Sequence, residues 1–260
     1  MKIFSLTADR HAPVHTTKPF RHELKYLISE GEREQLKTRM RFLFHLDSHA
    51  SGGSYMIRSL YFDDYWNSAY EEKSMGVMER QKYRIRIYNA MDSTIRLERK
   101  RKSGSYIQKE AAKLTRDEVE HILTGEYGFL LHHREPLCQE FYVECVSHVM
   151  RPRVIVDYDR EPFIMEPGTV RVTFDNNVRA AILGENLFDP ALPTLPVLEP
   201  GKTIMEVKFT EFLPEIVRNT ILPSAAEATA LSKYVLCYEK TQYLHGFSYW
   251  KDNGGQDLNR

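Results

Sequence analysis

Three segments in the first half of the chain alternate between charged and apolar side chains, and this pattern constrains the fold more than any other feature. Residues 81–89, 94–101 and 106–114 each alternate and are separated only by short turns. Because successive side chains of a β-strand point to opposite faces, the pattern predicts an antiparallel meander of three strands. In the first strand every second residue from Lys82 to Arg86 is basic, so the basic side chains share one face.

The charge of the chain is balanced overall but not locally. The 260 residues include 36 basic and 36 acidic side chains, and the formal net charge is zero. Residues 79–113 nevertheless hold eleven basic and four acidic side chains, a local net charge of +7. This distribution favours a local anionic partner and argues against a globally basic nucleic-acid-binding protein.

The remaining segments predict an α+β domain built around an antiparallel sheet. Further strands are expected at residues 20–28, 55–62, 153–158, 169–174 and 203–209. Helices are expected at about residues 29–43, 115–125, 136–150, 210–222 and 224–245, with capping boxes that begin at Ser29, Thr115 and Ser224. We expect this domain to span residues 19–247, between a flexible arm of residues 1–18 and a polar tail of residues 248–260.

The charged strand faces contain more basic than acidic residues on at least five predicted strands. One interpretation is a solvated face, although such a face usually mixes both signs more evenly. The other is an inward-facing lining of a closed sheet, for which phosphate groups are the natural partners of Arg and Lys. On such a lining Glu206 could hold a hard divalent cation or form an ion pair with Lys208. The residues alone leave these alternatives open.

A series of short motifs follows in a fixed order between residues 20 and 243. They are His22-Glu23-Leu24-Lys25-Tyr26, Ser59-Leu60-Tyr61-Phe62-Asp63, Lys82-Tyr83-Arg84-Ile85-Arg86-Ile87-Tyr88, Leu97-Glu98-Arg99-Lys100, Gln108-Lys109-Glu110, Arg151-Pro152-Arg153, Tyr158-Asp159-Arg160, Val170-Arg171-Val172-Thr173-Phe174-Asp175, Met205-Glu206-Val207-Lys208 and Ser232-Lys233-Tyr234. In order and spacing they resemble the VTC domain, the polyphosphate polymerase domain of the vacuolar transporter chaperone complex and its bacterial relatives. This domain belongs to the group of triphosphate tunnel enzymes.

The resemblance implies an eight-stranded antiparallel β tunnel, a closed barrel with flanking helices. It implies a polyphosphate polymerase that transfers the ATP γ-phosphoryl group to a growing polyphosphate chain. The cofactor would be Mn²⁺ or Mg²⁺, with ATP as substrate. A tunnel-fold triphosphatase and a non-catalytic module that binds polyphosphate or inositol phosphates remain alternatives.

The resemblance also implies a role for individual residues. The phosphate ligands in the tunnel would be Lys25, Arg84, Arg86, Lys100, Lys109, Arg153, Arg171 and Lys233. The residues that bind ATP would be Arg84, Arg86, Lys100, Ser232 and Lys233, and Glu206 would be the metal ligand. Arg21 stands where the hydrolase and cyclase branches of the group have the first glutamate of Glu-x-Glu-x-Lys, which favours the polymerase branch.

The predicted surroundings of the protein follow from what the sequence contains and from the family. No apolar run approaches the roughly 20 residues that span a bilayer, and the three cysteines have no paired or metal-binding spacing. We expect a cytoplasmic protein that binds ATP and polyphosphate and no nucleic acid. The family context implies a membrane-protein partner that receives the product, which would place the chain at the inner face of a membrane.

Overall fold

The structure of the chain is a computed structural model that describes most of the sequence. The described residues are 21–48, 50, 52–104, 106–166, 170–181, 187–210, 212–222 and 228–248. The predicted arm of residues 1–18, the predicted capping box at Ser224 and nearly all of the predicted tail lie outside these ranges.

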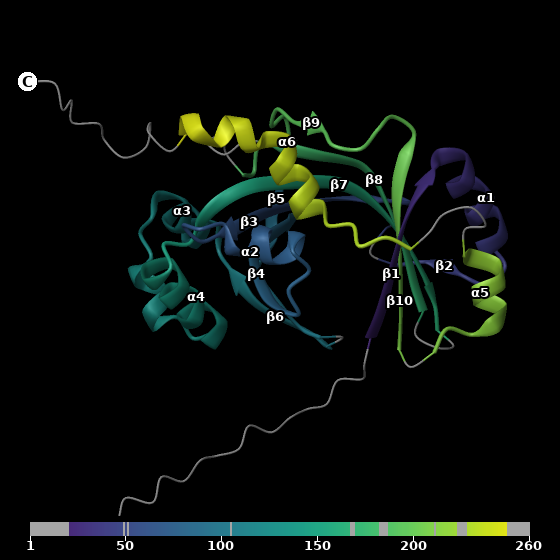
Figure 1. The fold of residues 1–260 in the computed structure, drawn as a ribbon, viewed down its shortest axis with the longest axis horizontal. Helices are drawn as coiled ribbons and strands as arrows, with labels where there is room; N and C mark the ends of the chain where they lie inside the picture. The colour runs from purple at the N-terminus through teal and green to yellow at the C-terminus, as the bar shows by residue number, and fades with distance from the viewer. Residues whose placement is uncertain are drawn as a thin grey trace, which may run out of the picture.

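Runs of consecutive strands are separated by helices along the chain (Figure 1). The strands are β1 (Arg21–Ser29), β2 (His45–Leu46), β3 (Tyr55–Asp63), β4 (Glu79–Tyr88), β5 (Met91–Ser103), β6 (Tyr106–Leu114), β7 (Arg151–Met165), β8 (Val170–Ala181), β9 (Leu195–Pro196) and β10 (Lys202–Thr210). The helices are α1 (Glu30–Met40), α2 (Ser68–Ser74), α3 (Arg116–Thr124), α4 (Pro136–Ser147), α5 (Glu215–Ile221) and α6 (Lys233–Ser248), with one 3₁₀ turn, η1 (Gly128–His132).

The long strands form one antiparallel sheet in the order β1-β10-β8-β7-β3-β4-β5-β6. This confirms the predicted α+β class and the antiparallel sheet. The predicted closed barrel is corrected, because no hydrogen-bonded ladder joins β1 to β6 among the described residues. A side-chain contact joins the inner faces of the two parts of the sheet: Lys100 Nζ of β5 donates to Glu23 Oε2 of β1 at 3.3 Å.

Several predicted elements have different boundaries in the structure. β7 and β8 extend beyond the predicted segments, to Met165 and Ala181. The helix predicted from residue 224 begins only at Lys233, and residues 228–232 are not helical. α2 and the 3₁₀ turn were not predicted, since both are too short for a clear hydrophobic period.

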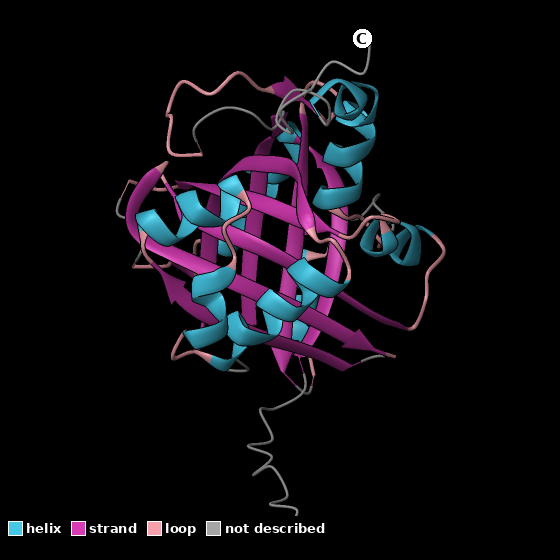
Figure 2. Cartoon of the chain, turned by 90° about the vertical axis from the view of Figure 1, so that its left-hand side faces the viewer, coloured by secondary structure: helices cyan, strands magenta, loops and turns pink. Residues whose placement is uncertain are grey.

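Two groups of helices lie against the outer face of the curled sheet, α3 and α4 at one side and α1 and α5 at the other (Figure 1). Figure 2 shows the first group in front of the strands. The apolar faces of β4, β5 and β6 pack on α3, η1 and α4 in a core that includes Ile85, Leu97 and Phe141. The apolar faces of β1, β8 and β10 pack on α1 and α5 in a second core. α6 packs on β7 and β8, in a third cluster with Tyr61, Val156 and Tyr158. The first two groups turn the opposite, charged faces of these strands inward, which favours the inward-facing lining over the solvated face.

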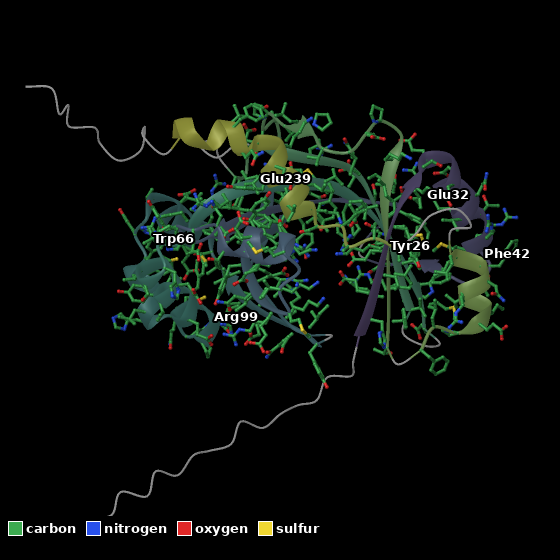
Figure 3. All side chains as sticks on the ribbon, in the orientation of Figure 1. Tyr26, Glu32, Phe42, Trp66, Arg99 and Glu239 are labelled. Atoms are coloured by element: carbon green, nitrogen blue, oxygen red, sulfur yellow. The ribbon has the colours of Figure 1, made fainter. Side chains whose placement is uncertain are left out.

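Two basic residues of the 79–113 region point outward, toward α4. Arg99 is almost fully buried and forms ion pairs with Glu110 and Glu140. Arg101 is more exposed and lies 3.5 Å from Glu140. Figure 3 shows Arg99 on the left half of the molecule, while Tyr26 lies in the right half near α1 and α5. The local excess of positive charge is thus divided between this outer ion-pair network and the inner face.

Candidate functional site

The register of β4, β5 and β6 arranges the inner cations in rows across the strands. Lys82 lies opposite Lys100, and Lys100 lies opposite Lys109. Like charges directly opposite one another destabilise a sheet, so this row favours an anion that lies against it. The next row places Arg84 opposite Glu98, which supplies one carboxylate to the wall.

Glu98 is the counter-ion of this wall. Its buried carboxylate lies 2.6 Å from Arg84 Nη2, 3.8 Å from Arg86 Nη1 and 2.5 Å from Lys109 Nζ. Burial by itself would raise the pKa of Glu98, but these three cations lower the pKa to about 2. Glu98 is therefore ionised, and it holds the cations that the sequence assigned to phosphate.

The opposite wall is formed by β1, β10 and β8. Glu206 is buried, and its carboxylate lies 3.0 Å from Lys208 Nζ. On the neighbouring strand, β1, Lys25 Nζ lies 2.9 Å from Glu23 Oε1. Despite its burial, the pKa of Glu206 is well below the usual range, chiefly because of Lys208 and Lys25. Both carboxylates of this wall are therefore negative next to the lysines.

A second ion-pair cluster joins this wall to the start of α6. Asp175 is fully buried and receives two hydrogen bonds from Arg160, at 2.7 and 2.8 Å. Lys233 Nζ lies 2.6 Å from the same carboxylate and 4.9 Å from the centroid of the Tyr158 ring. Arg160 also reaches Glu206 at 3.5 Å, so the two clusters are continuous.

Ser232 precedes Lys233 and caps α6. Its hydroxyl accepts a hydrogen bond from the amide of Val235 at 3.5 Å, and its carbonyl accepts from Leu236 at 3.0 Å. The cap fixes where the helix begins and therefore where the Lys233 side chain enters the site.

The structure brings most of the predicted site residues together, but two of them are held by residues outside the ion-pair clusters. Arg171 pairs with Asp47 at 3.1 Å and is partly exposed. Its Nε is buried and has no hydrogen-bond partner in the described part of the chain. Arg153 lies at the bulge between β3 and β7 and donates to the carbonyl of Asp64 at 2.6 Å. The residue of β7 that reaches Glu206 is Arg160.

Several members of the site were not assigned a role from the sequence. They are Glu23, Tyr61, Lys82, Glu98, Tyr158, Arg160 and Asp175. Strand parity was a usable signal for Glu98 and Asp175, because each alternates in step with an assigned cation on its own strand. Arg160 lay beyond the end of the predicted strand, so parity gave no signal for it.

The carboxylates fit only one kind of metal site. The described residues contain no group of three or more His, Cys, Asp or Glu side chains that could hold a metal ion. Glu206 and Glu23 nevertheless approach the same ammonium group, Lys208, at 3.0 and 3.9 Å. Mg²⁺ is commonly bound by one or two carboxylates together with substrate phosphates. These residues therefore fit a cation that the substrate helps to hold, and they do not fit an all-protein cage.

Comparison with known families identifies this arrangement. The sequence matches the VTC domain over residues 20–242, which is most of the chain. The chain belongs to the VTC domain family. The resemblance inferred from the motifs is therefore confirmed, and in this VTC domain the motifs lie on the two walls, on β3 and β7, and at the start of α6.

A solved structure shares the fold at low sequence identity. A Hippeastrum protein, described as an adenylyl cyclase with a dominant triphosphatase activity, is 14% identical with a TM-score of 0.52. That alignment covers 84% of this chain and 94% of the other. A Pyrococcus horikoshii OT3 protein is 15% identical with a TM-score of 0.45, covering 85% and 99% of the two chains. A search of the curated proteins finds no match.

None of the described helices is both long enough and apolar enough to cross a membrane.

Proposed function

We propose that this VTC domain is a polyphosphate polymerase that transfers the γ-phosphoryl group of ATP to the end of a growing polyphosphate chain. The observation that carries the proposal is the row of opposed cations on β4, β5 and β6, which faces a carboxylate-bearing wall on β1 and β10. A linear polyanion fits such a lining, because its charges repeat along its length as the rows do.

The phosphate ligands divide between the two walls. Arg84, Arg86, Lys100 and Lys109 bind phosphate from one side, and Lys25, Arg171 and Lys233 bind from the other. Glu98 and Asp175 hold several of these cations in place. Because these carboxylates hold them, the cations are already oriented when the substrate arrives. An entering phosphate then replaces the carboxylates or shares the cations with them. Arg153 would bind phosphate only after releasing the Asp64 carbonyl.

Phosphoryl transfer asks for positioning and neutralisation of charge more than for covalent help from the protein. The terminal phosphate of the acceptor is the nucleophile, and ADP is the leaving group. No Ser, Cys or His of the chain therefore has to attack. The side chains hold donor and acceptor in line and neutralise the charge that develops on the transferred group. A Mn²⁺ or Mg²⁺ ion held by Glu206, with Glu23 beside it, would supply additional positive charge.

The reaction products test this proposal. The protein is incubated with ATP and Mn²⁺, and the products are separated by chain length. We expect a ladder of phosphate chains with a matching amount of ADP. Release of free phosphate without chain growth would instead assign the domain as a triphosphatase, and unchanged ATP would leave a binding module.

A further inference from the structure

Lys82 differs from the other cations of its row. Lys100 has Glu23 as a partner and Lys109 has Glu98. The ammonium of Lys82 has no hydrogen bond or ion pair among the described residues, and it lies 5.5 Å from the centroid of the Tyr61 ring. It faces the inner side of the sheet, directly opposite Lys100.

Tyr61 is the neighbour that Lys82 shares with the rest of the site. Its buried ring stacks on Tyr234 at 5.0 Å, and its hydroxyl oxygen lies 2.7 Å from Arg84 Nη1. The guanidinium carbon of Arg84 lies 5.6 Å from the centroid of the same ring. A phenol beside these cations loses its proton more readily than one in water.

The charged groups around the pair lower the proton affinity of both members. Burial lowers the pKa of Lys82 to about 7; Lys100, Lys25 and Arg84 also lower it, and Tyr61 raises it. For Tyr61, burial by itself would raise the pKa, but Arg84, Lys82 and Arg86 lower it to about 7. In the empty site near neutral pH, the pair therefore alternates between a neutral form with one proton and a cationic form with two.

We propose that Lys82 is a further phosphate-binding residue of the site, and that Lys82 and Tyr61 together take up a proton from solvent when the phosphate chain binds. The inference rests on the proposed function for the identity of the ligand. A polyanion beside the pair favours the form with the additional positive charge. Lys82 then completes the row with Lys100 and Lys109 as an ammonium group. No covalent bond changes, and the only transfer is one proton from the buffer to the pair.

The inference predicts a defined dependence of binding on pH. Well below pH 7 the pair already holds both protons, so binding adds none. Above about pH 7.5 binding has to bring the proton in, and the affinity falls by up to tenfold for each pH unit. This slope persists until the pH reaches the pKa of the occupied pair.

The test is calorimetric titration of the full chain with tripolyphosphate, without metal and without ATP, in buffers of different ionisation enthalpy. At pH 8 we expect the wild-type protein to take up roughly one proton more than the double variant Tyr61→Phe/Lys82→Arg. The double variant keeps the ring stacking and a permanent cation at position 82 but cannot exchange these protons. At pH 6.5, Lys82→Gln should weaken binding roughly tenfold, whereas the surface variant Arg134→Gln should not.

Each outcome bears on the inference. Equal proton uptake by the two proteins would overturn it, and so would a wild-type affinity that is constant between pH 6.5 and 9, a measurement that needs no variant. Absence of tripolyphosphate binding would overturn it together with the proposed function. Binding with proton uptake but without chain growth from ATP would support the inference while contradicting polymerase activity.

Discussion

The hydroxyl oxygen of Tyr234 on α6 lies 2.5 Å from Asp63 Oδ2 at the end of β3. Asp63 is buried and also accepts hydrogen bonds from the backbone amides of Ala69 and Tyr70 in α2. One carboxylate thus fixes α2 and α6 to the sheet. Lys233, which precedes Tyr234, reaches Asp175 from this anchored turn.

Replacement of Tyr234 by Phe removes this hydrogen bond and keeps the ring on Tyr61. We expect a loss of about 1–3 kcal/mol in the free energy of unfolding, because a buried carboxylate loses a donor. Tripolyphosphate binding should also weaken, since Lys233 is no longer held in place. Tyr70→Phe is the matched control, because its hydroxyl contacts Glu239 at 3.2 Å in an exposed position. Denaturant unfolding that gives the same loss for both variants would contradict this role of Asp63.

Substitution of Glu98 should change the stability of the protein and its affinity for tripolyphosphate in opposite directions. Glu98→Gln leaves Arg84, Arg86 and Lys109 without their counter-ion, so the empty protein should lose about 3 kcal/mol of stability. The same change should tighten tripolyphosphate binding, because a competing carboxylate is gone. Glu110→Gln is the control, since Glu110 pairs with Arg99 on the outer face of the sheet. Calorimetry that shows Glu98→Gln binding more weakly than Glu110→Gln would be inconsistent with a shared phosphate site.

The lowered pKa of Glu98 predicts how stability changes in acid. The folded-state pKa of about 2 lies below the ordinary value of 4.5, so folding favours the ionised carboxylate. This contribution is present above about pH 5 and is lost as the pH falls toward 2. Its size is about 3 kcal/mol for a buried group. In Glu98→Gln the free energy of unfolding should decline less steeply between pH 5 and 2 than in the wild-type protein; equal slopes would show that other groups account for the decline.

Glu206 should separate metal-dependent catalysis from binding. In Glu206→Gln we expect chain growth to be abolished and Mn²⁺ binding in the presence of tripolyphosphate to be lost, because the proposed metal ligand is missing. Metal-free tripolyphosphate binding should persist, since Lys25 and Lys208 remain. Lys100→Gln provides the contrast and should weaken metal-free binding. Unchanged turnover in Glu206→Gln would exclude Glu206 as the metal ligand.

The alternation of charged residues predicted the sheet and which cations share a face, because strand parity is a local property of the chain. It underestimated β7, because three charged residues and a proline at positions 159–162 follow the apolar run. Arg160 belongs to the strand all the same, and its side chain pairs with Asp175 of β8 at 2.7 Å, a tertiary contact. The contact between Glu23 and Lys100 is also tertiary and could not be seen in the sequence. The closed barrel was expected from the family resemblance, not from the residues.

The cations of the site were easier to predict than their partners. Arg84 and Lys109 stand in recognisable motifs, whereas the role of Glu98 depends on which side chains the register places around it. Lys82 was visible as a basic residue of the strand. Its lack of a partner could be seen only when its neighbours on β1, β3 and β5 were in position.

In the proposed reaction the γ-phosphoryl group of ATP becomes part of a phosphate chain. The most direct measurement follows ATP that carries a radioactive γ-phosphate through the reaction with Mn²⁺, with Glu206→Gln as the inactive control. We predict that the label enters chains of increasing length and that one ADP forms for each phosphate added. Recovery of all the label as free phosphate, in the wild-type protein and not in the variant, would contradict polymerase activity.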